Sequence, residues 1–155
     1  LKQKATPLII SKNLAEIKSL KVSSQNPDRL VLGADSVISL DNKLINKPKS
    51  RAEALKILKE LNNSKHFLIS SVCISKNGAM IWNHSEHSEL KMKNLSEKEL
   101  IKYLNKIDTD ILLRYGVYQI EADGLSLFEY IKGDKDSIMG LPIKQIMNYI
   151  NNYKT

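Results

Sequence analysis

Apolar and polar positions change their spacing several times along the chain, and each spacing predicts a different element. In the first segment with helical spacing, Leu14, Ile17 and Leu20 form an apolar stripe. Capping boxes that begin at Ser50 and Ser96 mark the starts of two later helices, and Pro142 suits the first residue of the last one. The predicted helices are 11–23, about 51–61, 96–105, a short one near 109–113, and 143–151.

Strand patterns occupy most of the segments between these helices. The predicted strands are 29–34, 37–40, 43–45, 66–75, 79–92 and 124–131. The pairs Asp41-Asn42 and Asn77-Gly78 predict two tight hairpin turns. The first strand is apolar throughout, so we expect it to be buried. Because helices and strands are mixed without strict alternation, the order predicts an α/β protein with a mixed sheet flanked by helices.

Length and composition set the class of protein. The chain has 155 residues, with 42% hydrophobic and 26% charged side chains, which is typical of a single globular domain spanning 1–155. No apolar stretch is long enough to span a membrane and no signal peptide is visible. The single cysteine, Cys73, excludes an internal disulfide and suits a reducing compartment, so we expect a cytoplasmic protein.

The net charge of +7 allows two interpretations. It fits a protein that binds nucleic acid, or it reflects a lysine-rich composition that says little about partners. Twenty-one of the 24 basic residues are lysine, and they are scattered along the chain with few aromatic residues between them. This pattern favours the second interpretation, while a basic surface would still attract anionic nucleotides.

A carboxylate at the end of the first strand is the strongest candidate for chemistry. Asp35 follows the run Leu30–Ala34, and Lys47 follows Asp35 by twelve residues and precedes Pro48. The carboxyl end of a strand is where open α/β sheets place ligands. A carboxylate there can bind Mg²⁺ or accept a proton from water, and a lysine held before a proline can contact phosphate. Alternatively, Asp35 is an ordinary turn residue and Lys47 is an exposed loop residue, neither with a role in chemistry.

Other residues give weaker signals. Lys18 lies on the apolar side of the first helix, where it either reaches solvent or points into a cleft. The segment 115–121 is polar and aromatic, so it is either a base-recognition loop or an ordinary strand edge. His84 to His87 does not have evident metal-site geometry, and we expect exposed strand residues there. We expect Cys73 to be a small core residue.

Taken together, these motifs resemble the Maf (septum formation) family of nucleoside triphosphate pyrophosphatases. The family patterns LA-x-x-K, GAD[TSQ], GKP and LS-x-x-EI-x-x-Y and a C-terminal signature match segments along nearly the whole chain. The matching segments are Leu14–Lys18, Gly33–Ser36, Asn46–Pro48, Leu95–Tyr103, Tyr118–Glu121, Leu127–Gly133 and Met139–Pro142.

The resemblance implies an elongated mixed α/β fold with two lobes around a cleft, similar to the inosine triphosphatase fold. It implies hydrolysis of the α–β phosphoanhydride of a nucleoside triphosphate, a requirement for Mg²⁺ or Mn²⁺, and a homodimer. By position, Asp35 would be the catalytic acid that binds metal or activates water, and Lys18 and Lys47 would hold the phosphates. The alternatives are a nucleotide- or partner-binding module without turnover and, less favoured, a nucleic-acid-binding protein.

The chain departs from the family pattern in two places. The family's opening S-x-S-x-R-R phosphate loop is absent, so we expect an N-terminal segment to be missing. Where many members have glutamine and glycine, this chain has Glu121 and Ala122. A carboxylate only accepts hydrogen bonds, which favours the adjacent N–H donors of guanine. The resemblance links the branch of the family that carries glutamate here to 7-methyl-GTP, so we expect a guanine-like or modified base. Gln119 is the alternative residue for base recognition.

Overall fold

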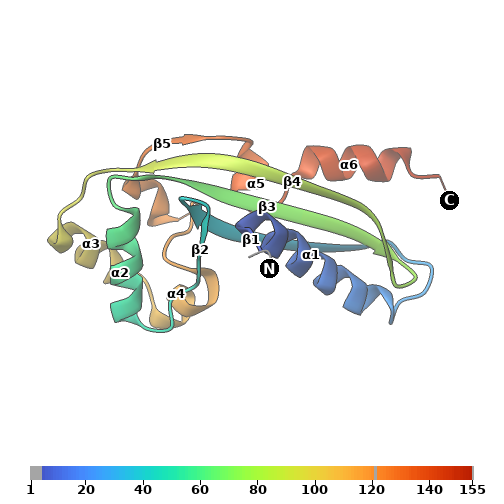
Figure 1. The fold of residues 1–155 in the computed structure, drawn as a ribbon, viewed down its shortest axis with the longest axis horizontal. Helices are drawn as coiled ribbons and strands as arrows, with labels where there is room; N and C mark the ends of the chain where they lie inside the picture. Colours follow the sequence, from blue (N-terminus) through green and yellow to red (C-terminus); the bar gives the residue numbers. More distant parts are fainter. Residues whose placement is uncertain (1–4, 121, 155) are drawn as a thin grey trace. The chain divides into compact units, whose positions relative to one another are not determined.

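The computed structural model describes residues 5–120 and 122–154 (Figure 1). Helices and strands alternate irregularly along the chain. Their bounds are α1 (Pro7–Ser23), β1 (Val31–Leu40), β2 (Lys43–Ile45), α2 (Arg51–Leu61), β3 (Lys65–Lys76), β4 (Ala79–Met92), α3 (Glu97–Leu104), α4 (Thr109–Tyr115), the 3₁₀ helix η1 (Asp123–Leu127), β5 (Phe128–Lys132), α5 (Lys135–Ile138) and α6 (Ile143–Asn152).

The five strands form one open antiparallel sheet in the order β2-β1-β3-β4-β5. Ile38 faces Ile45 in the β1–β2 hairpin, and Glu89 faces Lys132 where β4 pairs with β5. The predicted hairpin turns are confirmed, because their central residues have the positive φ angles that such turns require. The prediction of a mixed α/β fold with helices flanking a sheet is therefore confirmed.

The chain divides into two compact units. Unit 1 contains residues 5–37, 68–88 and 133–154, and unit 2 contains 38–67 and 89–132. The strands β1, β3 and β4 contribute residues to both units. None of the helices in the described ranges is long and apolar enough to cross a membrane.

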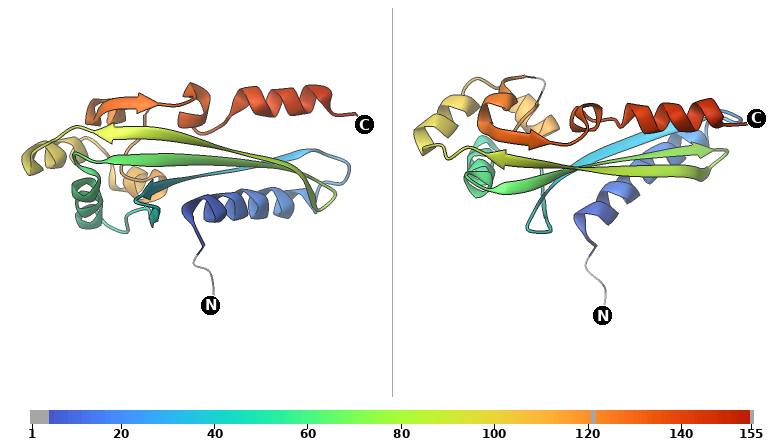
Figure 2. Two further views of the ribbon diagram at one scale, coloured as in Figure 1. Left: turned by 45° about the horizontal axis from the view of Figure 1, so that its top comes forward. Right: turned by 90° about the horizontal axis from the view of Figure 1, so that it is seen from above.

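In unit 1, helices cover both faces of the sheet (Figure 2). On one face α1 approaches the strands closely, because the side chains that it buries are small: Ser11, Ala15, Ser19 and Ser23. A Cβ atom on Gly33 of β1 would lie 2.3 Å from the Ala15 carbonyl oxygen. Only glycine therefore fits beneath this helix.

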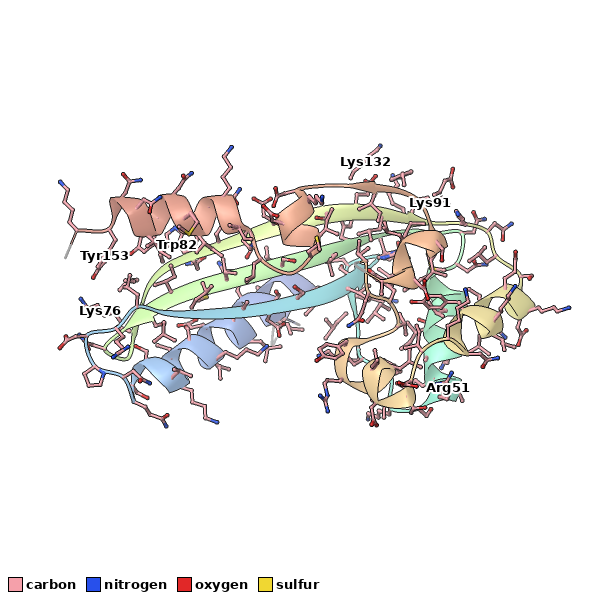
Figure 3. The ribbon with its side chains drawn as sticks, turned by 180° about the vertical axis from the view of Figure 1, so that it is seen from behind. Arg51, Lys76, Trp82, Lys91, Lys132 and Tyr153 are labelled. Carbon is pink, nitrogen blue, oxygen red and sulfur yellow. The ribbon has the colours of Figure 1, made fainter. Side chains whose placement is uncertain are left out.

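The other face of unit 1 carries α5 and α6. Ser70 of β3 donates a hydrogen bond to the Ser137 carbonyl of α5. Trp82 of β4 stacks on Tyr149 of α6 with ring centroids 5.0 Å apart, and Lys76 lies over the Tyr153 ring (Figure 3). Aromatic packing and one buried residue, Ile146, attach α6 to the sheet.

In unit 2, three helices surround a small apolar core. Its fully buried side chains include Leu58, Leu61, Leu100 and Leu112. Arg51, labelled in Figure 3, donates hydrogen bonds to the carbonyls of Leu104 and Ile107. The guanidinium therefore connects the first residue of α2 to the end of α3 and to the connection between α3 and α4.

Three predictions about elements are wrong. Helix α1 begins at Pro7, four residues before the predicted start at Ser11. Its buried side chains are mainly small ones, whereas Leu14 and Ile17, which were predicted to form the buried stripe, are 40% and 60% exposed. Residues 29–34 are not a separate buried strand: β1 is continuous to Leu40, and Leu32 is 42% exposed. The segment predicted as a strand from Gly124 begins as the 3₁₀ helix η1 and becomes strand β5 at Phe128.

The first part of β1 lies at the edge of the sheet, which explains its exposure. Its neighbour β2 is short and pairs only with residues 38–40, so the first part of β1 has β3 on one side and no β2 residue on the other. An apolar run predicts a strand but does not say whether the strand lies inside the sheet or at its edge.

Candidate active site

Asp35 lies in β1 and forms an ion pair with Lys18 of α1. The Lys18 Nζ is 2.8 Å from the Asp35 Oδ1 and also donates a 3.0 Å hydrogen bond to the Ala34 carbonyl. The Asp35 side chain is only 15% exposed, whereas that of Lys18 is 55% exposed. The ion pair therefore gives this partly buried carboxylate a cationic partner.

The close contact of α1 with β1 positions this pair. Gly33 admits the helix, and the Ser11 hydroxyl donates a hydrogen bond to the Asp35 carbonyl oxygen at 3.2 Å. Lys18 lies one turn after Leu14, and its long side chain reaches back to the strand. The Lys18 side chain therefore extends to the Asp35 carboxylate and at the same time remains partly exposed to solvent.

Lys47 belongs to unit 2, in the segment between β2 and α2. Its side chain is exposed, while the following Pro48 is buried. The proline therefore anchors the backbone, and the lysine stands at the surface. An exposed ammonium group on an anchored segment has the chemistry to bind an anionic phosphate.

Gln119 also lies in unit 2, in the segment between α4 and η1. Its carbonyl oxygen accepts hydrogen bonds from the N–H groups of Ala122 and Gly124. A Cβ on Gly124 would lie 2.1 Å from that oxygen, so this turn requires glycine. Glu121, the other residue predicted to recognise a base, lies outside the described residues.

Tyr118 precedes Gln119 and fixes this segment to the core of unit 2. Its hydroxyl lies 2.9 Å from the Nε2 of His66, and its ring packs edge-on against Phe128. Burial raises the pKa of Tyr118 and lowers the pKa of His66 to about 4. Both rings are therefore neutral near pH 7, as expected of core residues rather than acid–base catalysts.

A pocket of about 150 Å³ opens beside Gln119, and the segment 115–121, which was predicted as either a base-recognition loop or a strand edge, contributes Gly116, Tyr118 and Gln119 to its lining. It is lined by residues of α3, of the α3–α4 connection, of α4 and of the segment 116–124. Asp108 and Asp123 are among them. No local pattern marked these two acidic residues, and the folding of the chain between Tyr103 and Gly124 brings them to one pocket.

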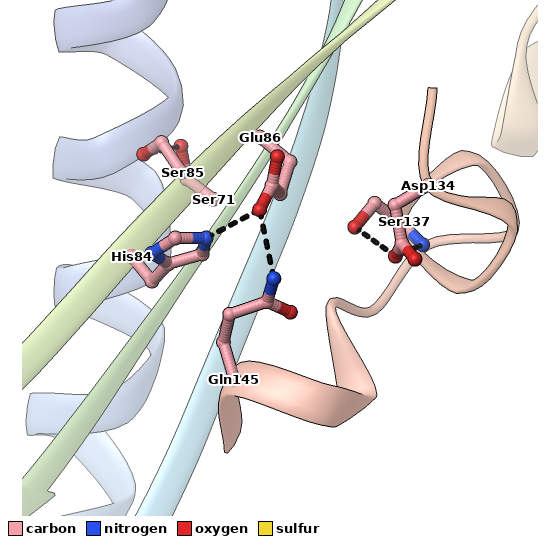
Figure 4. A network of polar contacts seen from close by, with 7 residues as sticks. All are labelled: Ser71, His84, Ser85, Glu86, Asp134, Ser137 and Gln145. Atoms are coloured by element: carbon pink, nitrogen blue, oxygen red, sulfur yellow. Dashed lines mark hydrogen bonds and ion pairs between the residues drawn. The ribbon is translucent and has the colours of Figure 1, made fainter. Parts of the chain in front are cut away.

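The histidine-rich segment of β4 forms a polar network in unit 1 and not a metal cluster. The Nε2 of His84 is 2.7 Å from Glu86, which also accepts a hydrogen bond from the Gln145 amide (Figure 4). In the described part of the chain, no group of three His, Cys, Asp or Glu side chains has metal-site geometry. Cys73 is buried, so its prediction as a core residue is confirmed.

A comparison with known families matches this chain over residues 1–153 with the family described as Maf-like protein. The chain belongs to the Maf-like family. Its segments with Asp35, Lys18, Lys47 and Gln119 all lie within the matched range.

Curated relatives of this Maf-like chain carry two different names. A nucleoside triphosphate pyrophosphatase of Pelagibacter ubique is 54% identical over 154 residues, which cover 99% of this chain and 79% of that protein. A 7-methyl-GTP pyrophosphatase of Bartonella quintana is 39% identical, over 92% of this chain and 72% of that protein. Another 7-methyl-GTP pyrophosphatase, from Rhizobium etli, is 34% identical over 97% of this chain and 76% of that protein.

Proposed function

We propose that this protein is a nucleoside triphosphate pyrophosphatase that releases a nucleoside monophosphate and pyrophosphate. The observation that carries this proposal is the ion pair between Lys18 of α1 and Asp35 of β1 in a Maf-like chain. Hydrolysis of a phosphoanhydride depends on positioning, charge neutralisation and a directed water more than on covalent catalysis. A fixed carboxylate beside an ammonium group provides two of these functions.

In this proposal Asp35 either accepts the proton of the attacking water or binds a divalent cation. Lys18, which is half exposed, and Lys47 bind phosphate oxygens of the substrate. Gln119 and Glu121 recognise the base. Relatives are named for nucleoside triphosphates in general or for 7-methyl-GTP, and we favour a guanine-type base such as that of 7-methyl-GTP because the Glu121 carboxylate only accepts hydrogen bonds.

The candidate site fits Mg²⁺ or Mn²⁺ if substrate phosphate groups complete the coordination of the ion. Asp35 offers a carboxylate, and the described residues contain no further cluster that would make a complete protein cage. Mg²⁺ is often held by one or two carboxylates together with substrate phosphates, so a single aspartate is sufficient. When bound, the cation would neutralise charge on the phosphate groups.

The test is to measure pyrophosphate and monophosphate release from canonical and 7-methylated triphosphates with Mg²⁺ or Mn²⁺. We expect Asp35→Asn to lower turnover by about 10²–10³-fold, since it removes the positioned charge but keeps the side-chain shape. The control is Asp41→Asn, which changes an exposed turn residue whose positive φ asparagine also tolerates.

Two results would contradict the assignment. Full turnover in the folded Asp35→Asn variant would remove this residue from the mechanism. Nucleotide binding without release of pyrophosphate in the unsubstituted protein would favour a binding module instead.

A further inference from the structure

The residue after Asp35 joins β1 to the opposite face of the sheet. Successive side chains of a strand point to opposite faces, so Asp35 faces α1, where it meets Lys18, and Ser36 faces the side that carries α5. The Ser36 hydroxyl oxygen lies 3.1 Å from that of Ser70 in β3, and Ser70 donates a 2.8 Å hydrogen bond to the Ser137 carbonyl. Three serines from three segments of unit 1 therefore form one chain of hydrogen bonds.

The direction of this chain follows from the number of its protons. A serine hydroxyl has a single proton, and Ser70 donates its own to the Ser137 carbonyl. The hydroxyl of Ser36 must therefore donate to the oxygen of Ser70. Because Ser70 is only 1% exposed, water has little access to compete for these hydrogen bonds.

The far end of the hydrogen-bond chain is anchored to the sheet. The Asp134 carboxylate caps α5, because it accepts hydrogen bonds from the N–H and the hydroxyl of Ser137 at 2.9 and 2.7 Å (Figure 4). A Cβ atom on the preceding Gly133 would overlap the Ser88 side chain, so the backbone that leads into α5 lies directly against β4. The Ser137 carbonyl is thus an acceptor with a fixed place above the sheet.

The backbone around Asp35 depends on side-chain contacts because the sheet holds it on one side only. The first part of β1 pairs with β3, whereas β2 pairs only with the last residues of that strand. On the α1 face, Ser11 donates to the Asp35 carbonyl oxygen and Lys18 binds the carboxylate. On the opposite face, the hydrogen bond from Ser36 to Ser70 supplies the matching attachment. Contacts on both faces therefore determine where the carboxylate lies.

We propose that Ser70 is a positioning residue for hydrolysis, which acts through Ser36 to hold β1, and with it the Asp35 carboxylate, where that group meets water or a divalent cation. The proposal rests on the proposed function, since it requires Asp35 to act on the substrate. Ser70 is buried in the sheet, so it works through its neighbour and not by contact with the nucleotide. A displacement of about 1 Å at a reacting group can cost on the order of 10²-fold in rate, so the loss of one buried hydroxyl can be measured as turnover.

The test is a double-mutant cycle of Ser70→Ala and Ser36→Ala, measured as kcat and KM for pyrophosphate release. We expect each single variant to lower kcat by about tenfold and to change KM by less than about twofold, since Lys18 and Lys47 still bind phosphate. The double variant should also lose about tenfold, because both substitutions break the same hydrogen bond. An unchanged kcat in Ser70→Ala, or losses that multiply to about a hundredfold in the double variant, would overturn the proposal.

Ser71→Ala is the matched control. Ser71 follows Ser70 in β3 and is equally buried, and its hydroxyl oxygen lies 2.8 Å from that of Ser85 in β4, on the side away from β1. The control thus breaks a hydroxyl pair of the same kind and should leave kcat unchanged. An equal loss of kcat in Ser71→Ala would assign the effect to a general loosening of the sheet and would overturn the role of Ser70.

Hydrogen exchange at the backbone amides of residues 31–37 adds a measurement that requires no turnover. Ser70→Ala should speed exchange in this segment severalfold, whereas Ser71→Ala should not, because only the first variant releases β1. Normal pyrophosphate release with unchanged exchange and kcat in Ser70→Ala would overturn the role of Ser70 alone. Absence of pyrophosphate release from the unsubstituted protein would instead refute the proposed function, and with it any catalytic consequence of this hydrogen-bond chain.

Discussion

At the scale of single residues, His66 shows how burial determines a charge. It is 1% exposed, its Nε2 lies beside the Tyr118 hydroxyl, and its Nδ1 is buried without a hydrogen-bond partner among the described residues. A buried acceptor without a hydrogen-bond partner costs less free energy than a buried donor without one. This difference favours the tautomer in which the Nε2–H of His66 donates to the Tyr118 hydroxyl. Protonation would add a second buried N–H and a charge.

This environment predicts a stability that depends on pH. The pKa of His66 is lowered from 6.5 to about 4, so the unfolded chain binds a proton at a higher pH than the folded one. The stabilising effect is complete above about pH 6.5 and disappears as the pH falls towards 4. Between pH 7.5 and 5 we expect this histidine to reduce the free energy of unfolding by about 2 kcal/mol, measured by urea denaturation.

The comparison for this prediction is the double variant His66→Phe with Tyr118→Phe, which removes the titrating ring and the hydroxyl that would lose its partner. Over the same pH range, its free energy of unfolding should decrease by about 2 kcal/mol less than that of the unsubstituted protein. Equal pH dependence in both proteins would show that His66 does not govern the effect.

Lys18 and Asp35 illustrate what residue types alone can predict. A carboxylate after an apolar run and a lysine on an apolar helix side were recognisable as candidates, since each is unusual in its local pattern. Their 2.8 Å contact was not predictable, because it depends on the distance between α1 and β1. That distance is set by a glycine and by small side chains whose importance is visible only after packing.

At the scale of elements, α1 shows why hydrophobic spacing can mislead. Leu14 and Ile17 have helical spacing but remain exposed, and the buried face consists of serines and Ala15. A helix that lies very close to a strand has no room for large side chains, so small residues occupy the contact. The true start was readable from Thr6-Pro7, because Thr6 accepts a hydrogen bond from the Ile9 N–H and proline suits the first helical turn.

This packing predicts that Gly33→Ala is strongly destabilising. The new Cβ would lie 2.3 Å from the Ala15 oxygen and 2.6 Å from the Ser19 nitrogen, both backbone atoms that cannot turn aside. We expect a loss on the order of 3 kcal/mol in the free energy of unfolding, since α1 must move away from the sheet. Urea denaturation measures it.

Gly116→Ala provides the comparison for this substitution. Gly116 has a positive φ of 98°, but no neighbouring atom lies within 4 Å of the position that an alanine Cβ would take. Only backbone strain of about 1–2 kcal/mol is therefore expected. If Gly33→Ala cost no more than Gly116→Ala, the close contact between α1 and β1 would not be confirmed in solution.

At the scale of the whole molecule, the net charge of +7 favours the approach of anionic substrates. Lysines spread over the surface create a positive field that concentrates anions near the protein. The field is screened by salt, with a Debye length of about 10 Å at 0.1 M. It acts on any polyanion and therefore does not distinguish substrates.

Nucleoside triphosphate binding should consequently weaken as salt is added. Between about 0.05 and 0.5 M NaCl we expect KM for a triphosphate to rise several-fold, with a smaller change in the affinity for the corresponding monophosphate, which carries less charge. Steady-state kinetics and calorimetry give the two values. A KM independent of salt would show that general electrostatic attraction contributes little.

The sequence by itself determined the family, the α/β class, the hairpin turns and most helix and strand positions. These are local properties, set by side-chain spacing, turn residues and short motifs. The tertiary structure decided that the first part of β1 lies at the edge of the sheet, that small residues form the buried face of α1, and that Lys18 meets Asp35. Each of these depends on contacts between segments distant in sequence, which packing determines and local patterns do not encode.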